Sequence, residues 1–446
     1  MLDDQNDSAQ GKSYLCTMSL PRIAFHHFGC KVNFAEASAL SRQFIEKGYS
    51  VVDFHDPAEI YVISTCVVTA VAEKKCRAAI RQAHRMNPGA KIAVIGCFPE
   101  LKHEEIEKMD GVSVVLGHTD KFNLLEEIGR SGPGNAVPNP VELNKKDTFI
   151  PSYSYGDRTR SFLKIQDGCD YYCAYCTIPL ARGHSRSDTV ANVTRNVREI
   201  IKTGIREIVL TGVNIGDFGR QHNETLLQLL NEIAVIPGVP RIRLSSIEPD
   251  LLKDGIIERM ASPGPFMPHF HIPLQSGSDR VLQAMKRRYR RDLYADRIKK
   301  IRSLLPDACI AADVIAGFPG ETGEEFLDSL SFCESLDLSY MHVFTYSKRQ
   351  HTLAAGMKDL MMDSERTRRS AVLHELSEKK KKEFYLRNRN REAAVLFESD
   401  HQGGFLHGYT ENYIRVKTAY DPKLVNEIVK VRLEKLEPSM EYLITL

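Results

Sequence analysis

Three cysteines stand close together in the segment Gly168-Cys169-Asp170-Tyr171-Tyr172-Cys173-Ala174-Tyr175-Cys176, which constrains the fold more than any other part of the sequence. Thiols at this spacing can turn their sulfurs towards one point, as in metal sites of compartments that keep thiols reduced. A structural zinc site needs four protein ligands, and His184 is the nearest candidate for the fourth. A [4Fe-4S] cluster held by three thiolates instead leaves one iron open for a ligand that is not protein. The segment therefore predicts a metal-binding loop, with zinc and iron-sulfur both open.

The chain of 446 residues is long enough for two to four domains. It contains no run of about 20 apolar residues, so the sequence argues against a membrane span. The first twenty residues lack the basic start and apolar core of a signal peptide. We therefore expect a cytoplasmic protein that has no membrane partner.

Residues 22–129 alternate between apolar runs and helical patterns, which predicts a mostly parallel α/β layer. The expected strands are 23–28, 60–64, 92–95 and 112–116. A helix is expected over 36–47, where apolar residues recur at helical spacing and Gly48 can end the helix in a left-handed turn.

Three further cysteines, Cys30, Cys66 and Cys97, each follow one of these strands. The carboxyl ends of parallel strands meet at one edge of a sheet, where ligands bind in open α/β folds. Burial is the ordinary explanation for a single cysteine, but it does not predict three cysteines at the same structural point. We therefore predict a second metal cluster with three thiol ligands.

Residues 130–160 are rich in Gly, Pro, Ser and Asn, which is typical of a linker. From residue 162 to residue 344 the strand and helix patterns alternate again. The six expected strands are 162–165, 207–211, 241–245, 269–272, 309–315 and 340–345. This pattern predicts a partial βα barrel, whose chemistry belongs at the carboxyl ends of the strands.

Polar turns follow five of these strands. They are the cysteine loop and the segments 211–214, 245–249, 273–278 and 317–321. A single glycine-rich turn most often only shapes the chain. Five polar turns around the same end of the barrel would supply the convergent amides and hydroxyls that bind a nucleoside cofactor.

The last part of the chain, residues 392–446, has strand patterns at 394–398, 413–417 and 428–433, which predict a small β-barrel. Its segment 409–415 mixes basic and aromatic side chains, so it is either an RNA contact or a packed hairpin. Residues 286–300 carry eight Lys or Arg against two Asp. That stretch fits either a solvated helix face or a nucleic-acid surface.

The CxxxCxxC spacing, with the aromatic Tyr175 before the last cysteine, resembles the signature of radical S-adenosylmethionine (SAM) enzymes. From Ala24 to its end the chain further resembles the methylthiotransferases. The matching segments are 29–33, 167–183, 210–216, 271–278 and 408–413. Lys31-Val32-Asn33 is most similar to the branch that modifies threonylcarbamoyladenosine beside the tRNA anticodon. Sister branches act on isopentenyladenosine in tRNA or on an aspartate of a ribosomal protein.

The resemblance implies an α/β protein in four segments. They are an N-terminal parallel-sheet domain with an auxiliary cluster (21–133), a linker (134–154), a partial (βα)6 radical-SAM core (155–385) and an RNA-binding TRAM domain built as a small β-barrel (386–446). It implies a tRNA-modifying transferase that adds a methylthio group to C2 of N6-threonylcarbamoyladenosine at position 37. The implied partners are the tRNA anticodon stem-loop, an electron donor of flavodoxin or ferredoxin type, and a sulfur source.

The resemblance also implies two [4Fe-4S] clusters and SAM as cofactors. The cluster of Cys169, Cys173 and Cys176 would bind and cleave SAM, and the resulting radical would remove hydrogen from C2 of the adenine. The cluster of Cys30, Cys66 and Cys97 would present the sulfur, and another SAM would supply the methyl group. No catalytic residue is expected beyond the cluster ligands. The expected SAM contacts are Tyr175, Asn214, Ser246, Gln275 and Gly317.

Two rival functions stay open at this point. One is a radical-SAM enzyme of another reaction type, in which the N-terminal cysteines only pass electrons. The other is a non-enzymatic RNA-binding protein with zinc in both cysteine sites. Identifying the metal in the two cysteine sites as zinc or iron distinguishes the RNA-binding zinc protein from an iron-sulfur enzyme.

Overall fold

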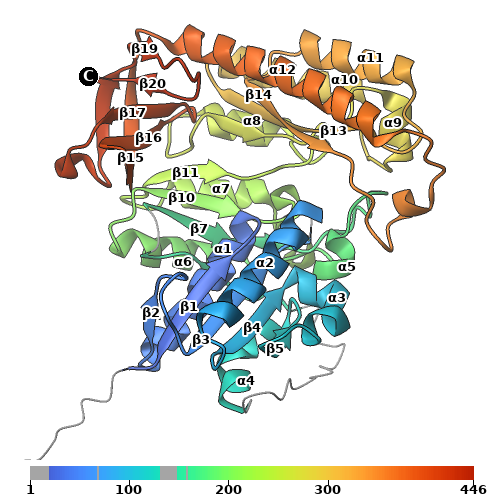
Figure 1. Ribbon diagram of the computed structural model, residues 1–446. Helices are drawn as coiled ribbons and strands as arrows, with labels where there is room; N and C mark the ends of the chain where they lie inside the picture. The colour runs from blue at the N-terminus through green and yellow to red at the C-terminus, as the bar shows by residue number, and fades with distance from the viewer. Residues whose placement is uncertain (1–19, 68–69, 131–147, 157–158, 446) are drawn as a thin grey trace, which may run out of the picture.

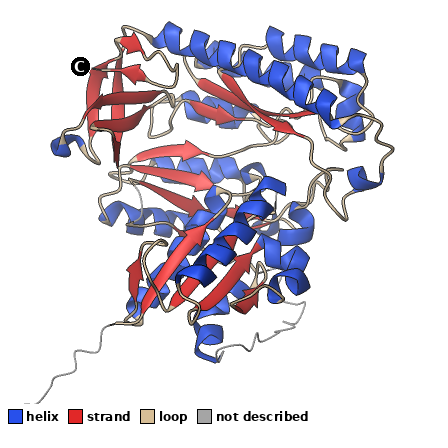
Figure 2. Ribbon diagram, in the orientation of Figure 1, coloured by secondary structure: helices blue, strands red, loops and turns tan. Residues whose placement is uncertain are grey.

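The computed structural model describes residues 20–67, 70–130, 148–156 and 159–445. Three parts follow one another along the chain: an N-terminal α/β layer, an incomplete barrel, and a C-terminal β sheet (Figures 1 and 2). Most of the predicted linker, residues 134–147, lies outside the described residues. Within the described parts of the chain, no helix is both long and apolar enough to cross a membrane.

The N-terminal sheet has five parallel strands in the order β2-β1-β3-β4-β5. Its elements are β1 (Arg22–His27), α1 (Lys31–Glu46), β2 (Ser50–Val52), β3 (Ile60–Thr65), α2 (Ala70–Met86), β4 (Lys91–Gly96), α3 (Cys97–Glu107), β5 (Val112–Leu116), the 3-10 helix η1 (Asp120–Asn123) and α4 (Leu124–Arg130). Helices α1 and α4 share an apolar core with one face of the sheet, and α2 and α3 share one with the other face. The predicted parallel layer is confirmed.

Two details of this layer differ from the sequence prediction. Helix α1 begins at Lys31 and not at residue 36, because the extended backbone of Cys30 forms the N-cap. Strand β2 was not predicted, since a run of three residues is too short to show a period.

The barrel contains six strands in two parallel groups. The first group is β7 (Arg160–Lys164), β10 (Glu207–Thr211) and β11 (Arg241–Leu244); the second is β12 (His269–His271), β13 (Cys309–Ala316) and β14 (Tyr340–Thr345). Parallel bridges from Ile242 to Phe266 and from Ser246 to His271 join the groups. The predicted six-strand partial barrel is confirmed. One correction concerns β6 (Ser152–Tyr153), which lies in the predicted linker but pairs antiparallel with β7.

Helices cover the outside of the barrel. They are α6 (Val190–Lys202), α7 (Leu226–Ala234), α8 (Asp254–Ala261), α9 (Asp279–Ala284), α10 (Arg291–Leu304) and α11 (Gly323–Ser335). The short helix α5 (Ile178–Arg182) follows the cysteine loop, and the short strands β8 (Gln166–Asp167) and β9 (Arg186–Ser187) flank this loop and helix. Helix α11 opens with a capping box, in which the Thr322 side chain accepts from the Glu325 backbone N–H and the Glu325 side chain accepts from the Thr322 backbone N–H.

Strand side chains alternate between the helix layer and the barrel interior. Ile208 and Leu244 belong to the large apolar core under the helices. On the opposite face, Phe162 and Val209 pack against Phe34 of α1. Because the outer strands β6 and β14 do not pair, the barrel is open on one side, and the N-terminal part packs against the inner face of β7.

The long helix α12 (Asp363–Asn388) packs along β14 and leads into the C-terminal sheet (Figure 1). This curled sheet has the order β18-β15-β16-β17-β20-β19. Its strands are β15 (Glu392–Gln402), β16 (Phe405–Thr410), β17 (Arg415–Ala419), β18 (Ile428–Arg432), β19 (Lys435–Leu436) and β20 (Leu443–Ile444). The predicted strand 413–417 was placed two residues too early, because Tyr413 has φ +65° and sits in the turn before β17. Strand β16 was not predicted.

A buried group of charges holds the N-terminal part against the barrel. The Glu36 carboxylate of α1 accepts from Lys121 of η1 at 2.5 Å, from Lys164 of β7 at 2.8 Å and from Arg182 of α5 at 3.3 Å. Burial alone would raise the pKa of Glu36, but these three cations outweigh it and hold the pKa well below its ordinary value. The carboxylate is therefore charged whenever the protein is folded near neutral pH.

Asp167 of β8 is a second carboxylate in this buried group of charges, on the side of the barrel. Its carboxylate accepts from Arg182 at 2.8 Å and lies 3.0 Å from the His118 ring. Burial works against the charge, but Arg182, His118 and Lys164 outweigh it, so the pKa of Asp167 is also well below its ordinary value. Burial lowers the pKa of His118 to about 3, which leaves its ring neutral.

Replacing Glu36 by Gln is expected to lower the free energy of unfolding by about 3–5 kcal/mol, because Lys121 would lose its carboxylate partner and the buried cations Lys164 and Arg182 would be left to share Asp167. A depressed folded pKa contributes stability above the unfolded pKa of about 4.3, and this contribution disappears as the pH falls. The difference between the wild type and the variant should therefore shrink below about pH 4. Urea unfolding at several pH values measures it, with Glu46→Gln at the exposed end of α1 as the control. Equal unfolding midpoints for Glu36→Gln and Glu46→Gln at pH 7 would contradict this role.

Candidate cluster and cofactor sites

The three N-terminal cysteines lie at the carboxyl end of the parallel sheet. Cys30 follows β1, Cys66 follows β3, and Cys97 opens α3 directly after β4. Gly29 has φ +110°, and a Cβ at that residue would lie 2.7 Å from the Cβ of Cys66, so these two loops touch. The thiols of Cys97 and Cys30 are close enough to interact electrostatically. The structure thus brings the three candidate ligands together, with Cys66 and Cys97 buried and Cys30 exposed.

Two polar side chains fasten these loops to one another. The Asn33 amide donates to the carbonyl groups of Phe28 at 3.1 Å and Thr65 at 2.9 Å, which ties the Cys30 loop to the Cys66 loop. The Thr65 hydroxyl donates to the carbonyl of Ile95 at 2.7 Å, which ties β3 to β4. Sequence reasoning did not assign either residue a role, although both stand within three residues of a candidate ligand.

The second trio lies in the loop after β8. Cys173 is buried, and Cys169 and Cys176 are half-buried, with the three thiols close enough to interact electrostatically. The loop needs Gly168, which has φ +67° and whose Cβ would lie 1.9 Å from the carbonyl oxygen of His184. Burial raises the pKa of Cys176 to about 12, so this thiol keeps its proton at neutral pH until a metal ion binds.

Arg287 comes from the basic stretch 286–300 and points into this site. Its Nη1 donates to the Cys173 sulfur at 3.1 Å, and the same guanidinium pairs with Glu248. Only 2% of the Arg287 side chain is exposed, so this residue is not part of a solvated face. His184, the candidate fourth zinc ligand, is exposed and pairs with Asp170 at 2.9 Å.

The spacing of the sulfurs bears on the metal. Among the described residues, neither cysteine trio brings its three sulfurs within 4.8 Å of one another. Sulfurs bound to one tetrahedral zinc ion, with bonds of about 2.3 Å, lie about 3.8 Å apart. Each trio is therefore wider than the spacing that a single tetrahedral zinc ion requires.

The expected SAM contacts fall in four environments. Tyr175 and Gln275 line one cavity of about 210 Å³, together with Asp313 and Phe344. Asn214 is buried, and neither polar atom of its side-chain amide has a hydrogen-bond partner among the described residues. Such a buried amide requires a partner, which a bound ligand can supply.

Gly317 is already engaged in the fold. Its N–H donates to Glu321 at 3.1 Å, and its carbonyl accepts from Arg366 at 3.1 Å. With φ +75°, it also lies so close to Arg366 that a Cβ would be 2.6 Å from that side chain. The structure therefore gives Gly317 a packing role and leaves its backbone polar groups occupied.

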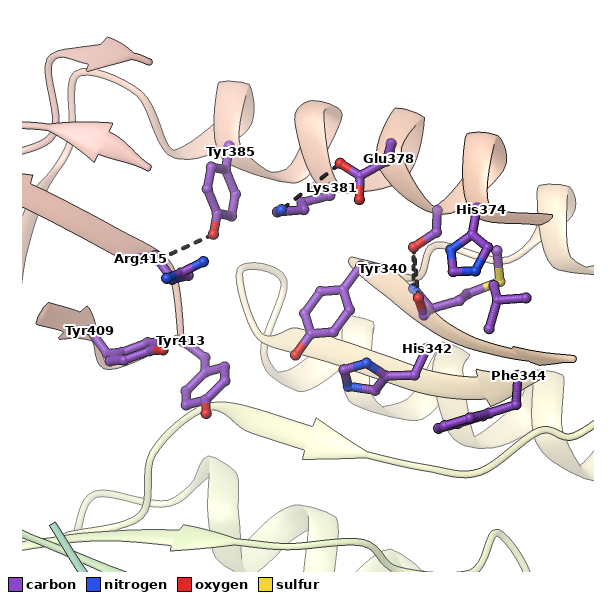
Figure 3. A pocket seen from close by; sticks show the side chains of 13 residues that line it. Tyr340, His342, Phe344, His374, Glu378, Lys381, Tyr385, Tyr409, Tyr413 and Arg415 are labelled. Atoms are coloured by element: carbon purple, nitrogen blue, oxygen red, sulfur yellow. Dashed lines mark hydrogen bonds and ion pairs between the residues drawn. The ribbon is translucent and has the colours of Figure 1, made fainter. Parts of the chain in front are cut away.

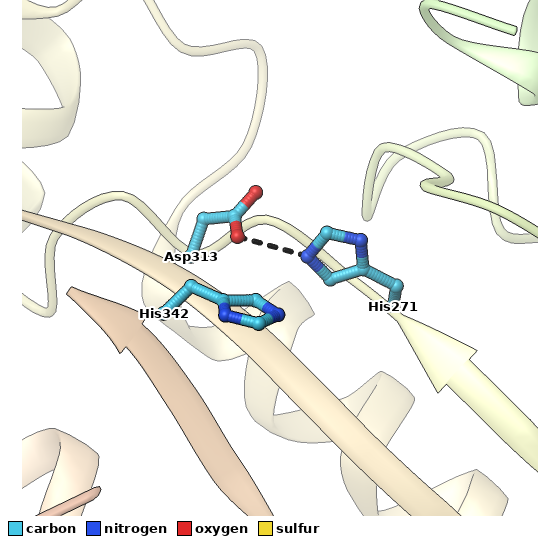
Figure 4. Close-up of side chains that lie close together, drawn as sticks. All are labelled: His271, Asp313 and His342. Carbon is cyan, nitrogen blue, oxygen red and sulfur yellow. Dashed lines mark hydrogen bonds and ion pairs between the residues drawn. The ribbon is translucent and has the colours of Figure 1, made fainter. Parts of the chain in front are cut away.

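Ser246 begins a polar chain across the barrel interior. Its hydroxyl lies 2.7 Å from Nδ1 of His271. Nε2 of His271 lies 2.9 Å from the Asp313 carboxylate (Figure 4). His342 stands beside them, with its ring centroid 5.5 Å from that of His271. Both nitrogens of His271 are used, so the chain holds this ring in one orientation. Sequence reasoning missed Asp313 and His342, which come from strands with no recognisable motif.

A larger aromatic cavity, of about 420 Å³, adjoins this interior between β14, α12 and the C-terminal sheet (Figure 3). Its lining includes Tyr340, His342, Phe344, Tyr385, Tyr409, Tyr413 and Arg415. Tyr409 stacks on Tyr413 with ring centroids 4.7 Å apart. Phe344 lines both this cavity and the one beside Tyr175, so the two cavities are neighbours.

Two family models match the chain. Residues 22–117 match the uncharacterized protein family UPF0004, and residues 163–333 match the radical SAM superfamily. Among solved structures, the radical SAM methyltransferase TsrM from Kitasatospora setae has a TM-score of 0.54 at 15% identity and covers 72% of this chain and 72% of that chain. This likeness confirms the radical SAM fold.

Curated relatives match nearly the whole chain. The threonylcarbamoyladenosine tRNA methylthiotransferase MtaB of Bacillus subtilis (strain 168) is 38% identical over 93% of this chain and 94% of its own length. MtaB of Thermotoga maritima is 35% identical over 93% of this chain and 94% of its own length. The tRNA-2-methylthio-N(6)-dimethylallyladenosine synthase of Clostridium perfringens (strain 13 / Type A) is 30% identical over 92% of this chain and 94% of its own length. Together with the paired cysteine sites and the radical SAM barrel, these matches show that the chain belongs to the radical SAM methylthiotransferase family.

Proposed function

We propose that this protein adds a methylthio group to C2 of N6-threonylcarbamoyladenosine at position 37 of tRNA, next to the anticodon. The observation that carries the proposal is the direct connection between the two cysteine sites. Asn33, three residues after Cys30, accepts from Arg182, and Arg182 also donates to Asp167, two residues before Cys169. MtaB relatives at 32–38% identity favour the threonylcarbamoyl substrate over the isopentenyl and ribosomal-protein alternatives.

Two [4Fe-4S] clusters fit the chemistry of the ligand sets. Each set consists of three thiols, and cations stand beside both: Arg182 acts on the thiols of Cys97 and Cys30, and Arg287 donates to Cys173. Burial raises the pKa of the Cys97 and Cys173 thiols, and the neighbouring cations oppose this shift by favouring the thiolate form that iron requires. When bound, the clusters and SAM supply the one-electron chemistry and the sulfur, and the chain's own side chains position them and exclude water.

For SAM we propose contacts from Tyr175, Asn214, Ser246, Gln275 and Gly317. The support is strongest for Asn214, whose buried amide lacks a partner, and weakest for Gly317, whose backbone groups are occupied. Tyr175 packs edge to face on Phe318 at 6.5 Å between ring centroids, which fixes its ring at the wall of the cavity.

For the RNA we propose the anticodon stem-loop as partner. The aromatic cavity presents ring faces and the Arg415 guanidinium, which suit unstacked bases of a single-stranded loop. We further assign residues 21–133 to the auxiliary-cluster domain, 134–154 to the linker, 155–385 to the radical-SAM core and 386–446 to the RNA-binding TRAM domain. A flavodoxin- or ferredoxin-type electron donor, a sulfur source and a cytoplasmic location complete the proposal.

Replacing Cys30 by Ala should abolish thiolation and leave SAM cleavage measurable, because only the auxiliary site loses a ligand. The iron content should fall from about eight to about four atoms per chain. Cys169→Ala should lose both activities, and Cys333→Ala, in the apolar core, should keep about eight iron atoms. Anaerobic iron analysis and assays of SAM cleavage and product formation measure these effects. Loss of both activities in Cys30→Ala would contradict separate roles for the two sites.

Replacing Asn214 by Ala should weaken SAM binding by about tenfold to a hundredfold, as expected for hydrogen bonds to a charged ligand. Equilibrium binding to the cluster-loaded enzyme measures the affinity, and iron content shows that the clusters are retained. Asn231→Ala, on the exposed face of α7, is the matched control. An unchanged SAM affinity in Asn214→Ala would remove this residue from the binding site.

Deleting the gene should remove methylthio-threonylcarbamoyladenosine from total tRNA and leave methylthio-isopentenyladenosine unchanged. Nucleoside mass spectrometry measures both products in the deletion strain and in a strain complemented with the wild-type gene. Persistence of the first product in the deletion strain would refute the proposed substrate. Loss of the second product instead would support the isopentenyladenosine branch.

A further inference from the structure

Three side chains of metal-binding type converge in the barrel interior (Figure 4). His271 of β12, Asp313 of β13 and His342 of β14 each offer one ligand atom, and these atoms all lie within 4.8 Å of one another. The strand register brings them together. Asp313 is paired with His342, and His271 is paired with Ala311, which stands two residues before Asp313 and therefore on the same face of the sheet.

The distances within this interior trio suit one shared metal ion. Nε2 of His271 lies 2.9 Å from the Asp313 carboxylate. Ligand atoms held by one ion with bonds of about 2.1 Å lie about 3.0–3.4 Å apart. The His342 nitrogen would have to move by at most about 2 Å to reach that spacing, and its side chain is exposed towards the aromatic cavity.

The second nitrogen of His271 is already fixed. Its Nδ1 lies 2.7 Å from the Ser246 hydroxyl. A histidine that binds a metal through Nε2 carries its proton on Nδ1 and donates it to a neighbouring acceptor, which orients the ring. Ser246 is placed to accept that proton and is therefore a positioning residue for the site.

Another trio with the same spacing occurs among the described residues, and cations already fill it. Glu36, His118 and Asp167 lie within 4.8 Å of one another, but Lys121 donates to Glu36 at 2.5 Å and Arg182 donates to Asp167 at 2.8 Å. A metal ion at that trio would have to displace buried ammonium and guanidinium groups.

The interior trio has no such cation. Within the described parts of the chain, Asp313 forms an ion pair only with His271, and 18% of its side chain is exposed. The charges of Arg287 and Lys31 act on the trio, but neither forms an ion pair with Asp313, and Arg287 is paired with Glu248. A carboxylate that is largely withdrawn from water is stabilised by a bound cation.

The trio also borders both cavities of the barrel. Asp313 lines the cavity of about 210 Å³ beside Tyr175, and His342 lines the aromatic cavity of about 420 Å³. Three protein ligands leave at least one position of the ion open, as in metal sites that bind an exchangeable molecule. Two imidazoles with one carboxylate favour a divalent first-row transition metal over Mg²⁺ or Ca²⁺.

We propose that His271, Asp313 and His342 bind one divalent transition-metal ion of the Zn²⁺ class, whose open position accepts an oxygen or nitrogen atom of a molecule in the adjoining cavities. This site goes beyond the proposed function, because it is separate from both cysteine trios and does not depend on methylthio transfer.

The test is zinc binding by the anaerobically purified enzyme with its clusters loaded. Equilibrium dialysis against Zn²⁺ compares the wild type with Asp313→Asn, His342→Asn and His342→Asp. The matched control is His374→Asn, which changes an exposed histidine of the same aromatic cavity outside the trio. Metal analysis counts zinc and iron, X-ray absorption at the zinc edge identifies the ligand atoms, and the thermal midpoint reports the fold.

The wild type and His374→Asn should bind about one zinc ion per chain through nitrogen and oxygen atoms and keep about eight iron atoms. Asp313→Asn and His342→Asn should weaken zinc binding by at least about a hundredfold, because loss of even an outer hydrogen-bond partner costs about tenfold to a hundredfold. His342→Asp, which restores an oxygen ligand, should recover part of the affinity.

Four outcomes would overturn the site. They are absence of zinc from the wild type, equal zinc affinity in the wild type and His342→Asn, an equal loss in His374→Asn, and zinc with sulfur ligands or at the expense of iron, which would place the ion in a cysteine site. None of these measurements requires SAM or RNA, so they leave the proposed function to its own tests.

Discussion

The interaction of Arg182 with Asn33, Glu36 and Asp167 determines how the two cysteine sites stand relative to each other. Arg182 ends the helix that follows the second cysteine loop, and Asp167 lies just before that loop. Their ion pair therefore joins the two ends of the loop. Asn33 and Glu36 come from the first helix, which begins at the first cysteine loop. All of these groups are buried, and in a low dielectric their attraction is strong and directional. Two domains that are far apart in sequence thereby meet in one geometry.

Much of this architecture follows from local patterns in the sequence. Alternating apolar runs predicted the parallel layer and the six barrel strands, because such runs are decided by residues close in sequence. The position of Cys30, Cys66 and Cys97 after strands singled out the first trio, and the close spacing of the cysteines in the segment 168–176 singled out the second. Long-range contacts were not predictable in this way. In the sequence, Arg287 is one of many basic residues, and only the folded barrel places it against Cys173. Tyr413 fits a strand pattern in the sequence, but its left-handed backbone places it in a turn.

The barrel interior shows why its polar residues are not interchangeable with those of an ordinary core. His271 uses one nitrogen on Ser246 and the other on Asp313, so neither its tautomer nor its ring orientation is free to vary independently of its neighbours. The Asn214 amide, by contrast, has no partner in the described chain. A satisfied network beside an unsatisfied group is the arrangement expected of a rigid wall around a space meant for ligands.

The order in which the chain is synthesised has a consequence for Glu36. Of its three cations, only Lys121 belongs to the N-terminal layer, and Lys164 and Arg182 emerge from the ribosome later. A nascent N-terminal layer therefore presents the Glu36 carboxylate, paired with Lys121 alone, on the face that β7 will cover. This charge keeps the face hydrated and disfavours early association with other apolar surfaces. Docking of the barrel removes this water only when both remaining cations are present, so the same charge that holds the mature interface together also delays its formation until the correct partner exists.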